Sequence, residues 1–142
     1  MKVVQLDLPL PPSANVIWRV NRRTGKPYLN PRYTKWKKTA LNAMWPQKPS
    51  GGWAYFPEAF NVHIALPIKL RIDPDNVWKP LLDFLQKPAG IIANDKHSQG
   101  TSQSRATDVP KGMCRVFVYE VQAPHPCPSL PFPSSPAPAR AV

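Results

Sequence analysis

Apolar and polar residues alternate along residues 59–70, where every even-numbered position is apolar and the polar residues fall on odd-numbered positions. Side chains two apart on an extended chain point to the same side, so this alternation predicts a long half-buried strand. His63 lies on its polar side and is not expected to be catalytic. Shorter alternating segments predict strands at residues 2–8 and 113–122. The polar segment at residues 96–112 begins with residues that could pair as a further strand.

Residues 31–45 carry apolar side chains at helical spacing. Asn30 and Pro31 make a favourable helix start, because asparagine caps an N-terminus and proline fits the first helical position. Aromatic residues at this spacing more often pack into a core than stack on bases, so we expect this side to face the interior. The apolar side consists of Tyr33, Trp36, Ala40, Leu41 and Met44.

A second helix is predicted at residues 76–85. Apolar residues at positions 77, 78, 81, 82, 84 and 85 form one stripe along it. Asp75 or Asn76 is placed to cap its start. Pro80 removes a backbone donor early in this helix and is expected to bend it.

These elements predict a small single domain of the α/β (α+β) class, with one mixed sheet and two main helices packed on it. The domain is expected to cover residues 1–122. Within it, residues 15–28 are polar and basic and are interpreted as a mobile loop or hairpin, and residues 46–57 as a turn-rich linker. From residue 123 the chain is rich in proline, serine and alanine, and only Arg140 is charged. Residues 123–142 are therefore predicted to be a disordered tail.

The chain of 142 residues is strongly basic, with a net charge of +11 and a pI near 10.1. This charge indicates a polyanionic partner. Nucleic acid fits better than a membrane, because no apolar run approaches the length of a membrane span. Cys114 lies in a predicted strand and Cys127 in the proline-rich segment, so we do not expect a disulfide between them. No leader-like apolar run follows Met1, and a reducing cytoplasm is the expected location.

Four of the eight acidic residues lie between positions 70 and 95. Asp73 and Asp75 stand two apart around Pro74, which favours extended backbone and would point both carboxylates to one side at a strand end. A helix and a tight turn would bring Asp95 back to them. Carboxylate oxygens are the ligands that Mg²⁺ prefers, so these residues predict a magnesium site next to a phosphate substrate.

A simpler interpretation of the same residues remains open. Asp73 and Asp75 could cap the following helix, and Lys79 and Asp83, four positions apart, could form a surface ion pair. The helix would place Asp75, Lys79 and Asp83 on one face. The basic character of the rest of the chain favours the metal site.

A longer pattern contains these residues. It consists of Asp73, Pro74, Asp75, Asn76, Lys79, Leu82, Asp83, Leu85, Asn94 and Asp95. This pattern resembles the signature of the RusA-type Holliday junction resolvases, and residues 8–15, with Trp18 and Arg19, are similar to the opening of that family. The resemblance covers about residues 3–121.

Members of that family are small dimeric endonucleases that cut four-way DNA junctions. The resemblance implies that Asp73, Asp75 and Asp95 bind Mg²⁺, for which Mn²⁺ could substitute, and that Lys79 is needed for cleavage. It also implies a homodimer, because a junction has two strands to cut symmetrically. The protein would then be bacterial or phage-encoded.

Two further residues of the motif are assigned supporting roles, and one departs from the family pattern. Asn76 follows the acidic pair directly. Asp83 lies four positions after Lys79 and is expected to orient that lysine rather than bind metal. At Asn94 the family often has a second aspartate.

Basic residues outside the motif are candidates for contacts with the phosphate backbone. They lie in the polar loop and on the polar side of the first predicted helix. The candidate DNA-contact residues are Arg19, Arg22, Arg23, Lys26, Lys35 and Lys38.

The expected function is magnesium-dependent cleavage of four-way (Holliday) junctions by phosphodiester hydrolysis, in DNA recombination and repair. The alternative is a non-catalytic basic DNA-binding protein, such as an inactive relative, in which the aspartates only cap helices. Three carboxylates near a phosphate would repel it unless a cation intervened. This repulsion favours the enzyme.

Overall fold

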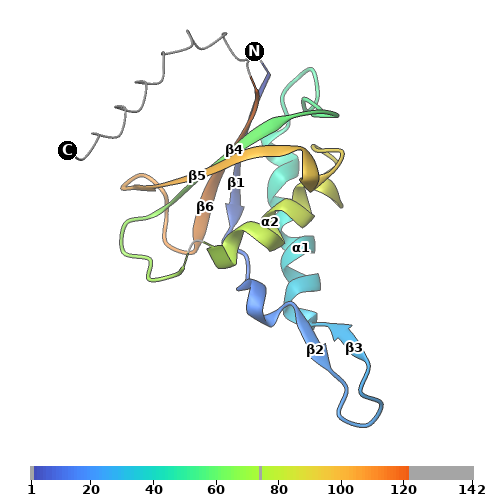
Figure 1. Cartoon of the computed structure of the whole chain (residues 1–142). Helices are drawn as coiled ribbons and strands as arrows, with labels where there is room; N and C mark the ends of the chain where they lie inside the picture. Colours follow the sequence, from blue (N-terminus) through green and yellow to red (C-terminus); the bar gives the residue numbers. More distant parts are fainter. Residues whose placement is uncertain (1, 74, 122–142) are drawn as a thin grey trace, which may run out of the picture.

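The computed structural model describes residues 2–73 and 75–121, and its centre is a four-stranded sheet with the order β1-β6-β4-β5 (Figure 1). β4 and β5 run parallel, and the other neighbouring strands are antiparallel. The mixed sheet and its two helices confirm the predicted small α+β domain. The strands are β1 (Val3–Pro9), β4 (Phe60–Pro67), β5 (Ser98–Ala106) and β6 (Met113–Glu120).

One face of the sheet forms the core, because the three neighbouring strands β1, β6 and β4 align their apolar residues. Leu6 of β1 pairs with Val116 of β6, and Val116 pairs with Ile64 of β4. All three side chains are fully buried. β5 has mostly exposed residues and is the edge strand next to β4, with which it pairs in parallel. The strand residues that belong to the core cluster are Val4, Leu6, Leu8, Phe60, Val62, Ile64, Leu66, Cys114, Val116 and Val118.

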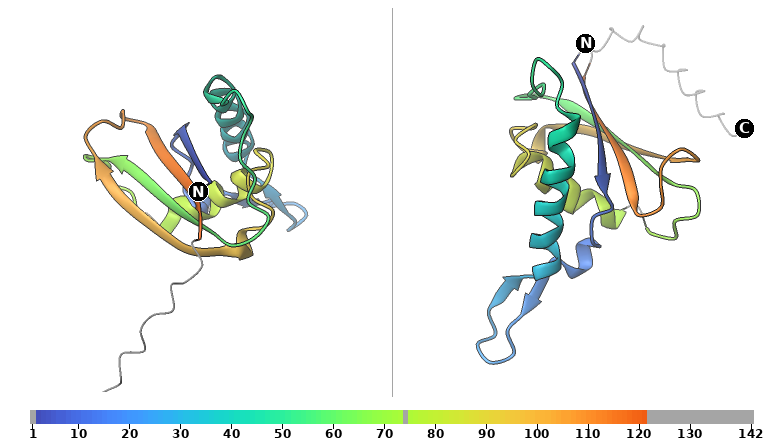
Figure 2. Two further views of the ribbon diagram at one scale, coloured as in Figure 1. Left: turned by 90° about the horizontal axis from the view of Figure 1, so that it is seen from above. Right: turned by 180° about the vertical axis from the view of Figure 1, so that it is seen from behind.

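Two helices, α1 (Pro31–Met44) and α2 (Asp75–Gln86), cover this face (Figure 2). The Trp36 ring of α1 lies edge-on to Phe84 of α2, with 5.3 Å between the ring centroids. The Trp36 indole N–H also donates a hydrogen bond to the Pro9 carbonyl at 2.9 Å, which joins α1 to the end of β1. Trp36 is therefore a core residue, as its helical spacing predicts.

α2 begins at Asp75, and Pro80 lies inside it on the buried side. The chain then turns at Gly90, whose φ of +68° is in the left-handed region that glycine adopts without a steric penalty. This turn leads to a short 3₁₀ helix, η3 (Asp95–His97). This turn brings Asp95 next to Lys79 of α2, whereas the predicted return of Asp95 to Asp73 and Asp75 stays a prediction.

The strand predicted at residues 59–70 is longer than β4 by one residue at its start and by three residues at its end. β4 ends at Pro67, and the backbone N–H of Leu70 bonds to the Pro67 carbonyl at 3.2 Å, which closes a turn. Residues 70–73 belong to no strand. Asp73 therefore does not stand at a strand end, because the chain turns away from the sheet although the apolar alternation continues.

The polar segment at residues 15–28 forms a hairpin that projects from the body of the molecule (Figure 1). It follows a 3₁₀ helix and leads directly to the N-cap of α1. Another 3₁₀ helix follows α1. These elements are η1 (Ala14–Val16), β2 (Trp18–Val20), β3 (Pro27–Leu29) and η2 (Trp45–Gln47).

Cys114 is buried in β6 and forms no disulfide with any described residue. Cys127 and the predicted tail at residues 123–142 lie outside the described residues. Among the helices that the structure describes, none is both long and apolar enough to cross a membrane.

Candidate functional site

The acidic motif lies at the start of α2. The Asp73 carboxylate accepts a hydrogen bond from the Asp75 backbone N–H (3.1 Å), and the Asp73 carbonyl accepts one from the Asn76 N–H (3.1 Å). These bonds satisfy donors that have no partner within the first helical turn. Asp73 therefore caps α2, as the simpler interpretation expects. Asp75 is the first helical residue and is exposed, and Asn76 is the second, so the prediction that Asp75 or Asn76 caps this helix is wrong: the capping acceptor is Asp73.

Farther along α2, Lys79 lies between two carboxylates, one from α2 and one from η3. Its ammonium nitrogen is 3.1 Å from Asp83 Oδ1 and 3.6 Å from Asp95 Oδ2. The side chain of Lys79 is 60% exposed, while those of Asp83 and Asp95 are 30% and 32% exposed. The hydrogen bond to Asp83 is the largest cause that raises the pKa of Lys79 above its usual value, and Asp95 adds to it. The lysine is therefore a surface cation paired with two carboxylates.

Tyr33 connects this group to the core. Its hydroxyl donates a hydrogen bond to Asp83 Oδ2 at 3.4 Å, while Asp83 Oδ1 faces Lys79. Burial, together with the charge of Asp83, raises the pKa of the Tyr33 hydroxyl well above its usual range. The sequence analysis assigns Tyr33 to the core stripe alone and misses this role. The only signal was a tyrosine, rather than a phenylalanine, at a buried helix position.

The backbone also holds Asp95 close to α2. Its N–H donates to Gln86 Oε1 at 3.4 Å, which ties η3 to the last residue of α2. Asn94 caps η3, because its side-chain oxygen accepts a bond from the Lys96 N–H at 3.0 Å. At the position where the family pattern often has a second aspartate, this chain therefore has a capping residue.

The structure brings Lys79, Asp83 and Asp95 together, and it places Asp73 and Asp75 at the preceding end of α2. Within residues 2–73 and 75–121, no group of three or more His, Cys, Asp or Glu side chains is arranged to hold a metal ion. The donor chemistry nevertheless suits Mg²⁺, since the candidate ligands are carboxylates that are exposed or half-buried. Magnesium binding by Asp73, Asp75 and Asp95 stays a prediction.

All six candidate DNA-contact residues lie on the hairpin and α1, and all are exposed. Lys35 and Lys38 line a shallow groove of about 390 Å³ together with Leu29 at the base of the hairpin. The α1 lysines therefore lie next to the base of the hairpin that carries the other four basic residues. Residues 8–57, which include it, contain no acidic residue. The basic residues of this segment are Arg19, Arg22, Arg23, Lys26, Arg32, Lys35, Lys37, Lys38 and Lys48.

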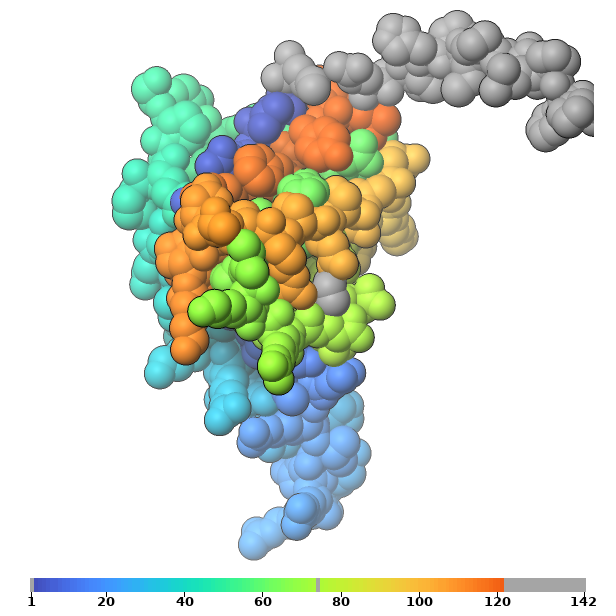
Figure 3. All heavy atoms as spheres, turned by 90° about the vertical axis from the view of Figure 1, so that its left-hand side faces the viewer, coloured from blue at the N-terminus to red at the C-terminus, as the bar shows by residue number. Residues whose placement is uncertain are grey.

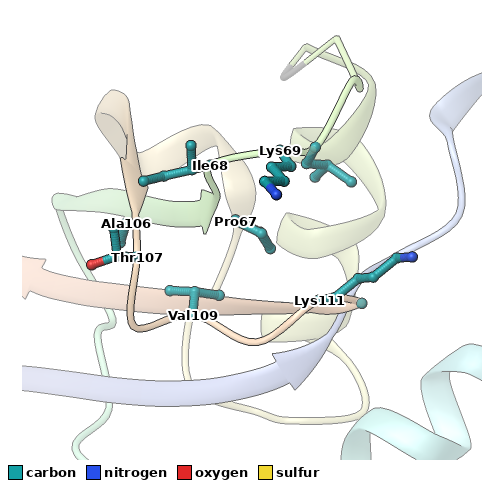
Figure 4. Close-up of a pocket in the computed structure, with 9 residues that line it drawn as sticks. Pro67, Ile68, Lys69, Ala106, Thr107, Val109 and Lys111 are labelled. Atoms are coloured by element: carbon teal, nitrogen blue, oxygen red, sulfur yellow. The ribbon is translucent and has the colours of Figure 1, made fainter.

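A pocket of about 510 Å³ lies beside the turn that leads to the acidic motif (Figure 4). The turn after β4 forms one wall, with Ile68 and Lys69, and the loop between β5 and β6 forms the other, with Val109 and Lys111. The lining is mostly apolar, with one lysine from each loop. This pocket is separate from the groove at the hairpin base.

His63 lies on the sheet face opposite the helices, where its ring nitrogens are 2.7 Å from Ser102 Oγ and 2.9 Å from Ser104 Oγ. Its position on the polar side of β4 is confirmed.

Comparison with models of known protein families finds no match, and comparison with curated proteins finds no similar one.

Proposed function

We propose that this protein is a magnesium-dependent, structure-selective endonuclease that cleaves four-way DNA junctions. The observation that carries the proposal is Lys79, an exposed ammonium group paired with Asp83 of α2 and Asp95 of η3. Asp73 precedes α2 and Asp75 is its first residue, so five charged side chains lie along this helix and the segments on either side of it. The rest of the chain is strongly basic, which supports a polyanionic substrate.

The carboxylates of Asp73, Asp75 and Asp95 are the residues that would hold Mg²⁺. When bound, the ion supplies Lewis-acid polarisation of the scissile phosphate and lowers the pKa of a bound water. Asp73 would do this while its Oδ1 still caps α2. Asp95 would exchange part of its contact with Lys79 for the metal, and the distance of 3.6 Å makes that contact the weaker of the two that Lys79 forms.

Lys79 would stabilise the negative charge that develops on the phosphate, and it is exposed enough to reach a substrate. Asp83 positions Lys79, and Tyr33 positions Asp83. This order of contacts supports a role for Asp83 in positioning Lys79 rather than in binding metal. Both of its oxygens already have partners within the domain.

The hairpin and α1 would hold the DNA. Contacts to phosphates give affinity for any duplex, so selectivity for a junction needs its shape to be recognised as well. A homodimer with one site per subunit would present two sites to the two strands that are cut. We place its action in the cytoplasm, where bacterial or phage DNA is recombined and repaired.

The deciding experiment uses the purified full chain and a labelled four-way junction, with and without Mg²⁺. Symmetric nicks that need Mg²⁺ are expected from the wild-type protein. Asp75→Asn should abolish cleavage and leave junction binding equal or stronger, because it removes a carboxylate from a phosphate-facing surface. If Asp75→Asn cuts at the wild-type rate, the carboxylate site is misassigned.

A second candidate is a non-catalytic, basic DNA-binding protein. The capping bond of Asp73 and the ion pair between Lys79 and Asp83 favour it, because these three residues then have structural roles that need no metal. The same experiment separates the two candidates. A binder would retain the junction in a mobility-shift assay and produce no nicks in Mg²⁺ or Mn²⁺.

A further inference from the structure

The hairpin exposes an apolar flank. Trp18 pairs with Leu29 across its strands, and Val20 pairs with Pro27. Residues directly opposite on antiparallel strands, and residues two apart along one strand, point to the same side, so these four share one flank. Trp18 is 61% exposed and Val20 is 62% exposed. An exposed patch of this kind on a projecting element indicates a contact surface.

The hairpin forms its own two-stranded sheet and stands away from the body (Figure 3). Two-stranded hairpins alone are marginally stable in water. Here both ends are fixed by hydrogen bonds. At the tip, the Asn21 N–H bonds to the Lys26 carbonyl at 2.9 Å and the Gly25 N–H to the Asn21 carbonyl at 2.8 Å. These two bonds close the turn at the tip.

The base of the hairpin is attached to α1 by Asn30, the only polar or charged residue that is buried among those described. Its side-chain N–H donates to the Val16 carbonyl at 2.7 Å, and its backbone N–H donates to the Ile17 carbonyl at 2.7 Å. The side-chain oxygen accepts from the Arg32 N–H at the start of α1. Asn30 therefore links the base of the hairpin to the start of α1, whose Tyr33 contacts the candidate site.

The charges around the apolar flank identify its partner. Leu29 on this flank lines the same groove as Lys35 and Lys38, and the tip carries Arg22 and Arg23. A second copy docked on the flank by two-fold symmetry would bring a second set of these cations against the first, which is unfavourable. A polyanion with apolar surface to cover would satisfy both features. DNA bases exposed at a branch point provide that surface.

We propose that Trp18 stacks on a base at the branch point of the junction while the hairpin tip and the α1 lysines hold the flanking phosphates. A two-stranded ribbon fits the major groove, and apolar side chains can insert between base steps and unstack them. Stacking is already interrupted at a branch point, so the energy needed to expose a base face is smaller there than in a duplex. This inference rests on the proposed function, and it supplies the shape recognition that phosphate contacts lack.

The test measures binding in the absence of metal and cutting in its presence. Junction DNA carries 2-aminopurine at the branch point, and matched duplex carries it at an internal step. The wild-type protein and Trp18→Phe should change the fluorescence at the branch point. Trp18→Ala should not, and it should weaken junction affinity by about tenfold while duplex affinity changes little.

Trp45→Ala is the matched control, because Trp45 is similarly exposed, at 58%, but lies beyond the far end of α1. It should behave as wild type. An unchanged junction affinity and fluorescence response in Trp18→Ala overturns the stacking role, even if the protein cuts junctions normally. A Trp18-dependent response in a protein that never cuts would leave the stacking role in place and reject the nuclease.

Sedimentation of the free proteins tests the other occupant of the flank. The wild type, Trp18→Ala and Trp18→Phe are expected to have the same mass in solution. Conversion of Trp18→Ala alone to a smaller species would assign the flank to self-association and overturn the stacking role. Circular dichroism of each variant reports whether the domain is folded. If Trp18→Ala is unfolded, Trp18→Phe still tests the stacking role, because it is expected to change the fluorescence at the branch point.

Discussion

The Tyr33 hydroxyl donates a hydrogen bond to Asp83 at 3.4 Å, and this contact joins the first turn of α1 to the exposed face of α2. The other oxygen of Asp83 holds Lys79. Tyr33 thereby sets the direction of a carboxylate that sets the position of a cation. Because its pKa is raised by burial and by Asp83, Tyr33 keeps its proton, and so remains a donor, at neutral and mildly alkaline pH.

Tyr33→Phe removes this donor and little else, because the ring can remain packed near Trp36. We expect the domain to fold and the cleavage rate to fall by about tenfold, as for other partners that orient a functional group. The effect should appear in single-turnover rates rather than in junction affinity. Tyr55→Phe is the control, since Tyr55 is exposed and far from α2 in sequence. Equal rates for both variants would show that Tyr33 is only a core residue.

Lys79→Ala should leave magnesium binding intact and lower the cleavage rate by about one hundredfold or more, if Lys79 acts like other electrostatic donors in the transition state. In this variant the metal affinity, measured by calorimetry, should be unchanged while the cleavage rate falls. Loss of both would mean that Lys79 organises the carboxylates instead.

Asp83→Asn gives a complementary result. The amide keeps the shape of the carboxylate and an acceptor for Tyr33, but it weakens the attraction to Lys79. We expect a smaller loss of rate than for Lys79→Ala and an unchanged requirement for Mg²⁺. A variant whose activity no longer responds to added metal would reassign Asp83 as a ligand.

Much of the fold was predictable because it follows local rules. The alternation around Val62 and Ile64, the Asn30 cap and the helical stripe through Trp36 each arise from residues close together in sequence. The end of β4 was not predictable, because Leu70 continues the alternation and only the turn at Pro67 removes it from the sheet.

The candidate site was predictable only in part. The pair Lys79 and Asp83 follows from their spacing on a helix. The contacts of Asp83 with Tyr33, fifty positions away, and of Lys79 with Asp95 depend on how helices and turns pack in three dimensions. The parallel pairing of β4 and β5 was likewise not predictable, because hydrophobic periodicity carries no information on which strands are neighbours.

Junction and duplex affinity should both fall steeply with salt, because the hairpin and α1 release counterions from the DNA backbone. Replacing Arg22 and Arg23 by alanine should reduce the slope of log affinity against log salt by about two, at roughly 0.9 per lost phosphate contact. Lys2→Ala with Lys87→Ala removes the same charge elsewhere on the surface and should leave the slope nearly unchanged. If the two double variants have the same slope, the hairpin tip does not contact phosphates.

Asn30 offers a way to separate helix capping from the attachment of the hairpin. Asn30→Ala removes the cap of α1 and leaves the Val16 carbonyl without its side-chain donor, so we expect the free energy of unfolding to fall by about 2–4 kcal/mol. Asn30→Ser can still cap α1 but is too short to reach Val16. Asn30→Ser should recover about 1 kcal/mol of the free energy of unfolding, measured in urea. Both variants should bind junctions more weakly than the wild type and to the same extent, because both lack the side-chain bond to Val16.

Asn42→Ala controls for the loss of an asparagine from α1, because Asn42 is exposed within the same helix. It should match the wild type in both measurements. The two readouts distinguish the roles of Asn30, since capping affects stability and the bond to Val16 affects how the hairpin is aimed at the DNA. Wild-type junction affinity in Asn30→Ser would show that the backbone bond from Asn30 to Ile17 is sufficient to position the hairpin.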